Sequence, residues 1–195
     1  MGTVRRLTVA AAMFISIAAL PSPEARAVQN KFDRIHDGRV NPGSVVSFTP
    51  HELNVWVAAE VPEYAPHGVR NTRIELGKGT ATASALIDFL KVRQAQGAET
   101  NWLIAKLIEG EHPVRVSARI QSSRGKATVY LQGVEIGGMS ITGSALDFLI
   151  DNFLKPLFPD ARINEPFELD EHVDHIDVQP DAARAFIKGP PNRRG

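Results

Sequence analysis

The sequence predicts an α+β fold, in which a curved antiparallel β-sheet is wrapped around or packed on a long apolar helix, with two shorter helices beside it. Two stretches alternate apolar and polar residues and reverse at glycine-containing turns, as β-hairpins do. A third stretch, near the C-terminus, repeats apolar residues at the period of a helix. An antiparallel sheet with one apolar face needs a cover, so we expect the helices to pack against the hairpins.

The N-terminus predicts a secretory signal peptide at residues 1–27. Arg5 and Arg6 precede an uncharged apolar stretch at residues 7–20, and residues 25–27 (Ala-Arg-Ala) have the pattern of a cleavage site. The apolar stretch is shorter than the roughly 20 residues that span a bilayer, which disfavours an uncleaved anchor. We therefore expect a cleaved Sec-type signal peptide and a periplasmic or secreted protein.

Composition narrows the class of protein further. The 195 residues include 22 Lys and Arg, 22 Asp and Glu, and no cysteine. This charge balance argues against nucleic acid as a partner, because that binding needs a concentrated basic patch. A chain without cysteine forms no disulfides, has no catalytic thiol and is not a lipoprotein. The length fits one domain, which we place at residues 45–188.

The segment before and just inside the domain predicts an extended stretch, a strand and a helix. Residues 28–44 are polar and rich in turn-forming pairs, so we expect an extended lead-in. A strand is expected at residues 44–48. Thr49 and Glu52 have the spacing of a capping box, which predicts that a helix begins there. Pro62 is expected to end this helix.

Two β-hairpins are predicted from the alternation of apolar and polar residues. The first joins residues 69–76 to residues 80–89 through the turn at residues 77–79 (Gly-Lys-Gly). The second joins residues 114–121 to residues 127–136. Each hairpin presents one apolar face, which predicts that both belong to one antiparallel sheet.

Two further helices and a closing β region complete the prediction. A short helix is expected at residues 100–110, and a long apolar helix at residues 143–158, where leucines and phenylalanines form a continuous stripe. The last strands are expected at residues 167–178 and 183–188. Residues 189–195 predict a disordered tail.

The sequence contains no catalytic motif that we recognise. Ser144 follows a glycine but lacks the preceding strand and second glycine of a nucleophile elbow. His172 and His175 lie among carboxylates and are weak metal candidates, because residues at odd spacing on a strand point to opposite faces. A solvated strand edge is the simpler interpretation. We expect no enzyme activity, no cofactor and no metal.

Apolar surface is the remaining candidate for function. The stripe at residues 143–158 is wider than one sheet face requires, and Trp56 and Trp102 each lie on a short predicted helix. An elongated apolar groove would suit acyl chains, since each buried methylene contributes about 0.8 kcal/mol. The same residues would serve equally well as packed core. The candidate lining residues are Leu53, Trp56, Val57, Leu146, Leu149, Ile150, Phe153, Leu154 and Leu157. The candidate rim residues, otherwise the solvated face of a sheet, are Arg70, Arg73, Arg115 and Arg119.

Four short phrases carry a resemblance to a known family. They are residues 49–54 (Thr-Pro-His-Glu-Leu-Asn), 68–74 (Gly-Val-Arg-Asn-Thr-Arg-Ile), 134–139 (Val-Glu-Ile-Gly-Gly-Met) and 166–169 (Pro-Phe-Glu-Leu). In this order the chain resembles the bacterial LmeA-like phospholipid-binding proteins over roughly residues 45–188. The resemblance implies half of a tubular lipid-binding, BPI-like fold, with a long curved sheet rolled around a helix and an interior that accommodates lipid. It implies no site residues.

Three functions are therefore open. The first is an exported, non-catalytic protein that binds or transfers a lipid or another apolar small molecule, with possible peripheral membrane contact. The second is an envelope structural or assembly module that binds a protein partner through its sheet edges. The third is a hydrolase or metal-dependent enzyme that uses His172 and His175.

Overall fold

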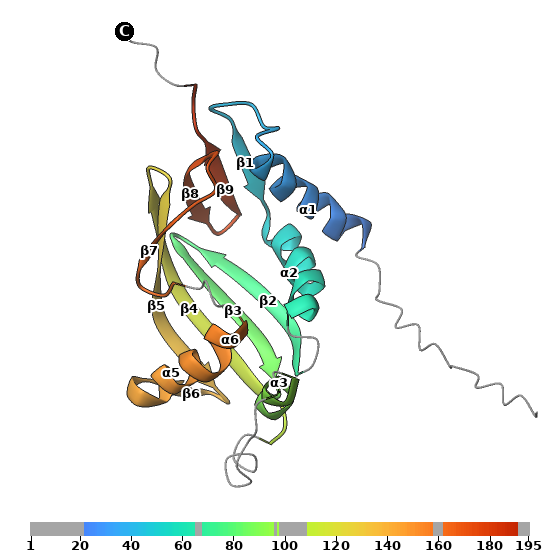
Figure 1. Cartoon of the computed structure of the whole chain (residues 1–195), viewed down its shortest axis with the longest axis vertical. Coiled ribbons are helices and arrows are strands. Elements are labelled where there is room, and N and C mark those ends of the chain that lie inside the picture. The colour runs from blue at the N-terminus through green and yellow to red at the C-terminus, as the bar shows by residue number, and fades with distance from the viewer. Residues whose placement is uncertain (1–21, 65–67, 96, 98–108, 158–161, 191–195) are drawn as a thin grey trace, which may run out of the picture.

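Two antiparallel sheets form the framework of the protein (Figure 1). The structure is a computed structural model that describes residues 22–64, 68–95, 97, 109–157 and 162–190. One sheet has the strand order β1-β9-β8, and the larger has the order β2-β3-β4-β5-β6, with β7 paired to the other end of β5. The predicted α+β class is confirmed. The strands are β1 (Val45–Phe48), β2 (Val69–Gly77), β3 (Thr80–Ile87), β4 (His112–Ser123), β5 (Lys126–Ile136), β6 (Met139–Ile141), β7 (Pro166–Glu168), β8 (Val173–Gln179) and β9 (Ala182–Ile187).

Both predicted hairpins form, as β2–β3 and β4–β5. The first differs from the prediction at its end, because β3 stops at Ile87 and Phe89 begins helix α3 (Phe89–Ala95). Asp88 is the physical reason, since its Oδ1 accepts a hydrogen bond from the Lys91 amide at 3.0 Å and thereby satisfies a donor of the first helical turn.

The predicted extended lead-in at residues 28–44 is wrong, because most of it belongs to helix α1 (Pro23–His36). Ser22 caps this helix by accepting a hydrogen bond from the Ala25 amide at 3.1 Å. Pro23 suits the first turn because its missing N–H would be unpaired there in any case. The apolar side chains of α1 are few and widely spaced among polar ones. The polar composition of the segment therefore predicted no helix, although α1 packs along one narrow apolar face.

Helix α2 (Pro50–Tyr64) begins as predicted. The Glu52 amide donates to Thr49 Oγ1 at 3.2 Å, and the Thr49 amide donates to Glu52 Oε2 at 2.9 Å, which completes the capping box. The helix continues past Pro62 to Tyr64, so the predicted end is two residues too early. A proline removes only the hydrogen bond to the carbonyl four residues before it, so the backbone can keep its helical course for the two residues that remain.

The predicted long apolar helix at residues 143–158 is not one helix. It is divided into α5 (Gly143–Leu149), the π-helical segment η1 (Ile150–Leu154) and α6 (Lys155–Leu157). Pro156 explains the break, because it has no N–H to donate and its ring would clash with the carbonyl four residues earlier. Within this stretch α5 has no buried side chain, whereas Phe153 in η1 is buried.

The apolar side chains form two separate cores at opposite ends of the molecule (Figure 1). The first core lies between α1, α2 and the three-stranded sheet, and Val28, which is 2% exposed, is its most buried member. The second core lies where α3 and η1 cover one end of the large sheet, and it contains Phe89, Val92, Val114 and Phe153. The middle of that apolar face is only half-buried, for example at Val116 and Ile120.

The two sheets are joined along the outer edge of β8. Alternate backbone groups on this edge are hydrogen-bonded by the hairpins of the large sheet. The bonds are Gly125 N–H to Asp174 O at 2.6 Å, Ser122 Oγ to both the N–H and the C=O of Ile176 at 2.7 Å, and Gly79 N–H to Val178 O at 2.8 Å. This edge is therefore paired, and the small sheet is held at a defined position on the large one.

Two predictions fall on residues that the structure does not describe. The short helix expected at residues 100–110, with Trp102, lies almost wholly outside the described residues, and so does most of the tail at residues 189–195. Within the described ranges, no helix has the length and apolar character needed to cross a membrane.

Candidate functional site

An apolar cavity of about 360 Å³ lies between α1, α2 and the three-stranded sheet. Its volume falls within the roughly 300–1,000 Å³ that is typical of small-molecule sites. Nine of its lining side chains are apolar: Phe32, Ile35, Phe48, Leu53, Leu169, Val173, Ile176, Ala183 and Ala185. Two polar residues, His36 and Asp170, complete the lining. The cavity is therefore an apolar chamber with one polar end.

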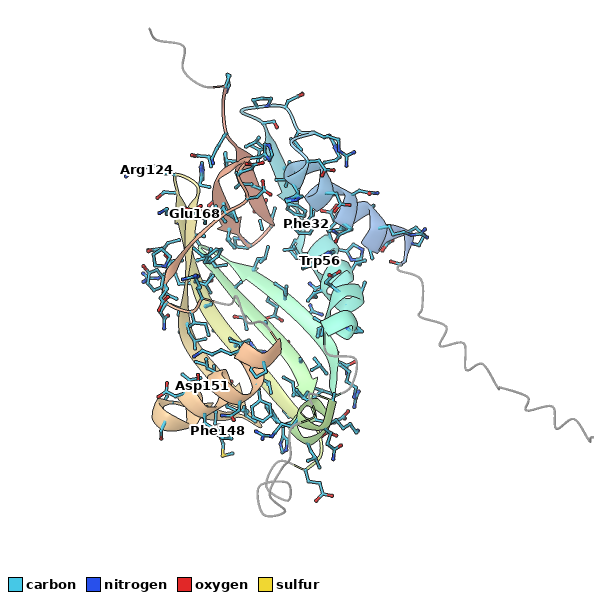
Figure 2. The ribbon with its side chains drawn as sticks, in the orientation of Figure 1. Phe32, Trp56, Arg124, Phe148, Asp151 and Glu168 are labelled. Carbon is cyan, nitrogen blue, oxygen red and sulfur yellow. The ribbon has the colours of Figure 1, made fainter. Side chains whose placement is uncertain are left out.

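Helix α1 supplies one wall of the cavity. Phe32, Ile35 and His36 are spaced i, i+3 and i+4, so they share one face of the helix. The ring of Phe32 stacks on Phe48 of β1, with centroids 4.4 Å apart and planes 17° apart, and lies 4.9 Å from the ring of Trp56 (Figure 2). These aromatic contacts fix the wall, because offset rings lose contact area if α1 moves away from the sheet.

Polar contacts also tie α1 to its neighbours. Lys31 Nζ lies 2.6 Å from Glu52 Oε1 and donates to the Ser47 carbonyl at 2.9 Å, which links α1 to both α2 and β1. Burial would raise the pKa of Glu52, but hydrogen bonds from Lys31 and Thr49 outweigh it and lower that pKa. Glu52 is therefore ionised at neutral pH, and the Lys31 ion pair holds the helix beside the cavity.

The polar end of the cavity is centred on the Asp170 carboxylate. Its Oδ1 accepts the His172 amide at 2.9 Å, and its Oδ2 lies 2.9 Å from His36 Nδ1 at the C-terminus of α1. Burial opposes ionisation of Asp170, but these hydrogen bonds lower its pKa below the ordinary value. The same hydrogen bond raises the pKa of His36. A persistent negative charge therefore lies at the mouth of an otherwise apolar chamber.

The two predicted metal candidates do not converge. His172 Nδ1 lies 3.2 Å from Asp170 Oδ1, whereas His175 Nδ1 lies 2.7 Å from Asp174 Oδ2. The ring of His175 also stacks on the ring of Phe186, with centroids 4.2 Å apart and planes 11° apart. In the part of the chain that the structure describes, no group of three or more His, Asp or Glu side chains is arranged to hold a metal ion.

The predicted lipid-lining residues divide between the two cores. Leu53 lines the cavity and Trp56 packs against the first core. Leu149 and Phe153 belong to the second core, at the other end of the molecule. The structure does not bring these two groups into one groove. Half-buried side chains on the same helices are Val57, Leu146, Ile150 and Leu154, and the side chain of Leu157 is outside the described ones.

The predicted rim arginines line the polar face of the large sheet. Arg70 pairs with Glu111, and Arg73 and Arg115 both lie within 4 Å of Glu75. The Arg119 guanidinium lies 5.0 Å from the centre of the Tyr130 ring. The cavity lining includes none of the four arginines. Their contacts are those of a solvated sheet face, which was the alternative interpretation.

Of the eleven residues that line the cavity, sequence reasoning identified only Leu53, and three of the others were missed because α1 was not predicted. Val28, Phe32 and Ile35 recur at i, i+4 and i+7, which is the spacing of a buried helical face. That signal was present but lay in a polar stretch beside the predicted cleavage site. The contributions of Leu169 and Ala185 could not be found in this way, because they depend on how distant strands pair.

A comparison with known proteins found no family model, no curated protein and no solved structure that matches this chain.

Proposed function

We propose that this protein is an exported, non-catalytic lipid-binding or lipid-transfer protein, and that it holds the apolar part of its ligand in the cavity between α1, α2 and the three-stranded sheet. The apolar lining of that cavity, with a polar pair at its mouth, is the observation that carries the proposal. The export part rests on the predicted signal peptide. Contact with a membrane surface is part of the same proposal.

The size of the cavity favours a single short acyl chain. Its volume of about 360 Å³ lies near the lower end of the roughly 300–1,000 Å³ that is typical of small-molecule sites, so the cavity suits one chain rather than a whole phospholipid. Burying each methylene contributes about 0.8 kcal/mol, which is enough for stable binding of such a chain.

The resemblance to LmeA-like proteins remains part of this proposal. It is supported by the curvature of the large sheet (Figure 1) and by the half-buried apolar middle of its covered face. The division of the predicted long helix by a π-helical segment departs from that pattern. The cavity in the smaller sheet is a separate feature, and it carries the lipid-binding proposal independently of the resemblance.

The alternative function, binding of a protein partner through sheet edges, has less support. The side-chain amide of Asn54 caps the β2 edge, because its Oδ1 accepts from the Ile74 amide at 2.7 Å and its Nδ2 donates to the Ile74 carbonyl at 2.8 Å. On β1, the Ser47 carbonyl accepts a hydrogen bond from Lys31 Nζ. Strand edges whose backbone groups are already hydrogen-bonded by side chains offer fewer free groups to an added strand.

Filling the cavity tests the proposal. Ala183 lines the cavity, and the variant Ala183→Leu puts three extra carbons into the space that the ligand would occupy. We expect it to weaken binding of an apolar fluorescent dye about tenfold or more, since each displaced methylene site is worth about 0.8 kcal/mol.

The matched control is Ala83→Leu, the same change at an exposed alanine of β3 in the other sheet. We expect this variant to bind the dye as the unmodified protein does. Native mass spectrometry of the protein from its own envelope would then show whether a lipid of matching size is bound. Equal dye binding by both variants, or no binding at all, would contradict the proposed function.

A further inference from the structure

The cavity presents one charged group to the head of a ligand. Of its eleven lining residues, nine are apolar, and the polar two are Asp170 and His36. The Asp170 side chain is 24% exposed, so it lies at the boundary between the apolar chamber and solvent. His36 is 81% exposed and its Nδ1 is occupied by Asp170. An amphiphile with its chain in the chamber would therefore place its head group beside the Asp170 carboxylate.

The charged groups around the cavity mouth do not outweigh the negative charge of Asp170. Asp37 and Glu171 both act electrostatically on His36, which places two further carboxylates near it. Arg39 is paired with Asp37, and Lys188 Nζ donates to the Glu171 carbonyl at 2.7 Å. Three carboxylates (Asp37, Asp170 and Glu171) therefore face the two permanent cations Arg39 and Lys188, and Asp170 is paired with neither cation. Its nearest side chains are the imidazoles of His36 at 2.9 Å and His172 at 3.2 Å.

We propose that this site selects single-chain amphiphiles with an uncharged or cationic head group over those with a carboxylate, an inference that rests on the proposed lipid-binding function. A carboxylate head would lie close to the like charge of Asp170 in a setting where water is partly excluded, and the two charges would repel. A hydroxyl or ammonium head group would instead donate a hydrogen bond to the Asp170 carboxylate. The head group, rather than the chain, would then determine specificity, because the apolar lining accepts any chain of suitable length.

The test compares three competitors of one chain length for displacement of an apolar dye from the full protein. Laurate carries a carboxylate, monolauroyl glycerol is uncharged and dodecylammonium is cationic, and each is used below its micelle-forming concentration at about pH 8, above the ordinary pKa of a histidine side chain. We expect laurate to require at least about fivefold higher concentration than either of the others, as expected for repulsion between two partly solvated charges.

Two variants assign the selectivity to Asp170. Asp170→Asn removes the charge and keeps the shape, so we expect laurate to compete as well as monolauroyl glycerol. Asp147→Asn, at an exposed carboxylate on α5, should leave the selectivity unchanged. A cooperative thermal unfolding transition serves as the control that each variant is folded. If the Asp170→Asn variant does not fold, the three competitors on the unmodified protein still decide the proposal.

The outcomes separate the two proposals. Equal competition by the three amphiphiles on the unmodified protein would overturn the head-group inference and leave lipid binding intact. Selectivity that persists in Asp170→Asn would overturn the role of Asp170. Failure of every amphiphile to displace the dye, or dye binding that is unaffected by Ala183→Leu, would overturn the proposed function itself.

Discussion

Asp170 links parts of the chain that are far apart in sequence. Its bond to His36 joins the end of α1 to the turn before β8 across 134 residues. The helix dipole favours a cationic side chain at this position of α1, and the carboxylate adds to that preference. A single proton on His36 therefore strengthens the contact that holds the end of α1 at the cavity mouth.

The His36–Asp170 pair predicts a pH-dependent contribution to stability. The folded pKa of His36 lies above 6.5, so its contribution is fully present below about pH 6.5 and is lost as the pH rises through the folded pKa. The folded pKa of Asp170 lies below 3.8, so its contribution is present above about pH 3.8 and is lost as the pH falls through the folded value. The pair is therefore most stabilising between these values, and Asp37 and Glu171 act on His36 in the same direction.

Melting temperatures of the unmodified protein and of His36→Gln test this prediction. We expect the unmodified protein to be the more stable at about pH 5 and the difference to shrink by about pH 8. The same substitution in an Asp170→Asn background is the control, because the coupling vanishes when the partner has no charge. A difference that grows with pH would contradict the assignment.

Helix α1 is the element on which the cavity depends. It supplies Phe32, Ile35 and His36 to the lining, and its most buried residue is Val28. Its first turn, from Pro23, lies within the predicted signal peptide. Cleavage after Ala27 would remove the Ser22 cap and the buried Ala25, and it would place a charged amino group on Val28.

The first turn of α1 is therefore expected to contribute measurably to stability. A chain that begins at Val28 should have a lower free energy of unfolding than one that begins at Ser22, by about 1–3 kcal/mol, because it loses an N-cap and buried contacts. Urea unfolding of the two chains provides the measurement. Ser22→Ala in the longer chain is the control and should account for the cap alone, about 0.5–2 kcal/mol. Equal stability of the two chains would show that α1 does not need its first turn.

At the scale of the whole molecule, the edge of β8 determines how the two sheets sit. Ser122 is central to this junction, because its hydroxyl satisfies both backbone groups of Ile176 at 2.7 Å. The backbone bonds from Gly79 and Gly125 lie on either side of it. The cavity is bounded by β8, so this junction also positions Ile176 and Val173 in its lining.

Removal of the Ser122 hydroxyl should loosen this junction. We expect Ser122→Ala to lower the free energy of unfolding by about 1–3 kcal/mol, since two part-buried backbone groups lose their partner. The amide of Ile176 should also exchange its hydrogen faster. Ser123→Ala, at the next and exposed position of β4, should change neither quantity. Unchanged exchange at Ile176 would show that the edge is held by the glycine bonds alone.

Elements that depend on near neighbours were predictable. The alternation in residues 69–76 and 114–121 predicted both hairpins, and the spacing of Thr49 and Glu52 predicted the start of α2. In contrast, residues 143–158 were predicted as one long helix because its apolar stripe is strong. Its π-helical segment follows from the backbone geometry imposed by Pro156, which a side-chain pattern does not record.

The sequence by itself therefore determined the antiparallel hairpins, the capped start of α2 and the α+β class, because hydrophobic period and capping act within a few residues. Only the tertiary structure decided which apolar stripe lines a cavity, since packed core and cavity lining have the same pattern along the chain. That choice required Phe32 of α1 to meet Phe48 of β1, and His36 to meet Asp170, which lies 134 residues further along the chain. Contacts between residues so far apart in sequence arise from the folded arrangement of the sheets, and they leave no local signature.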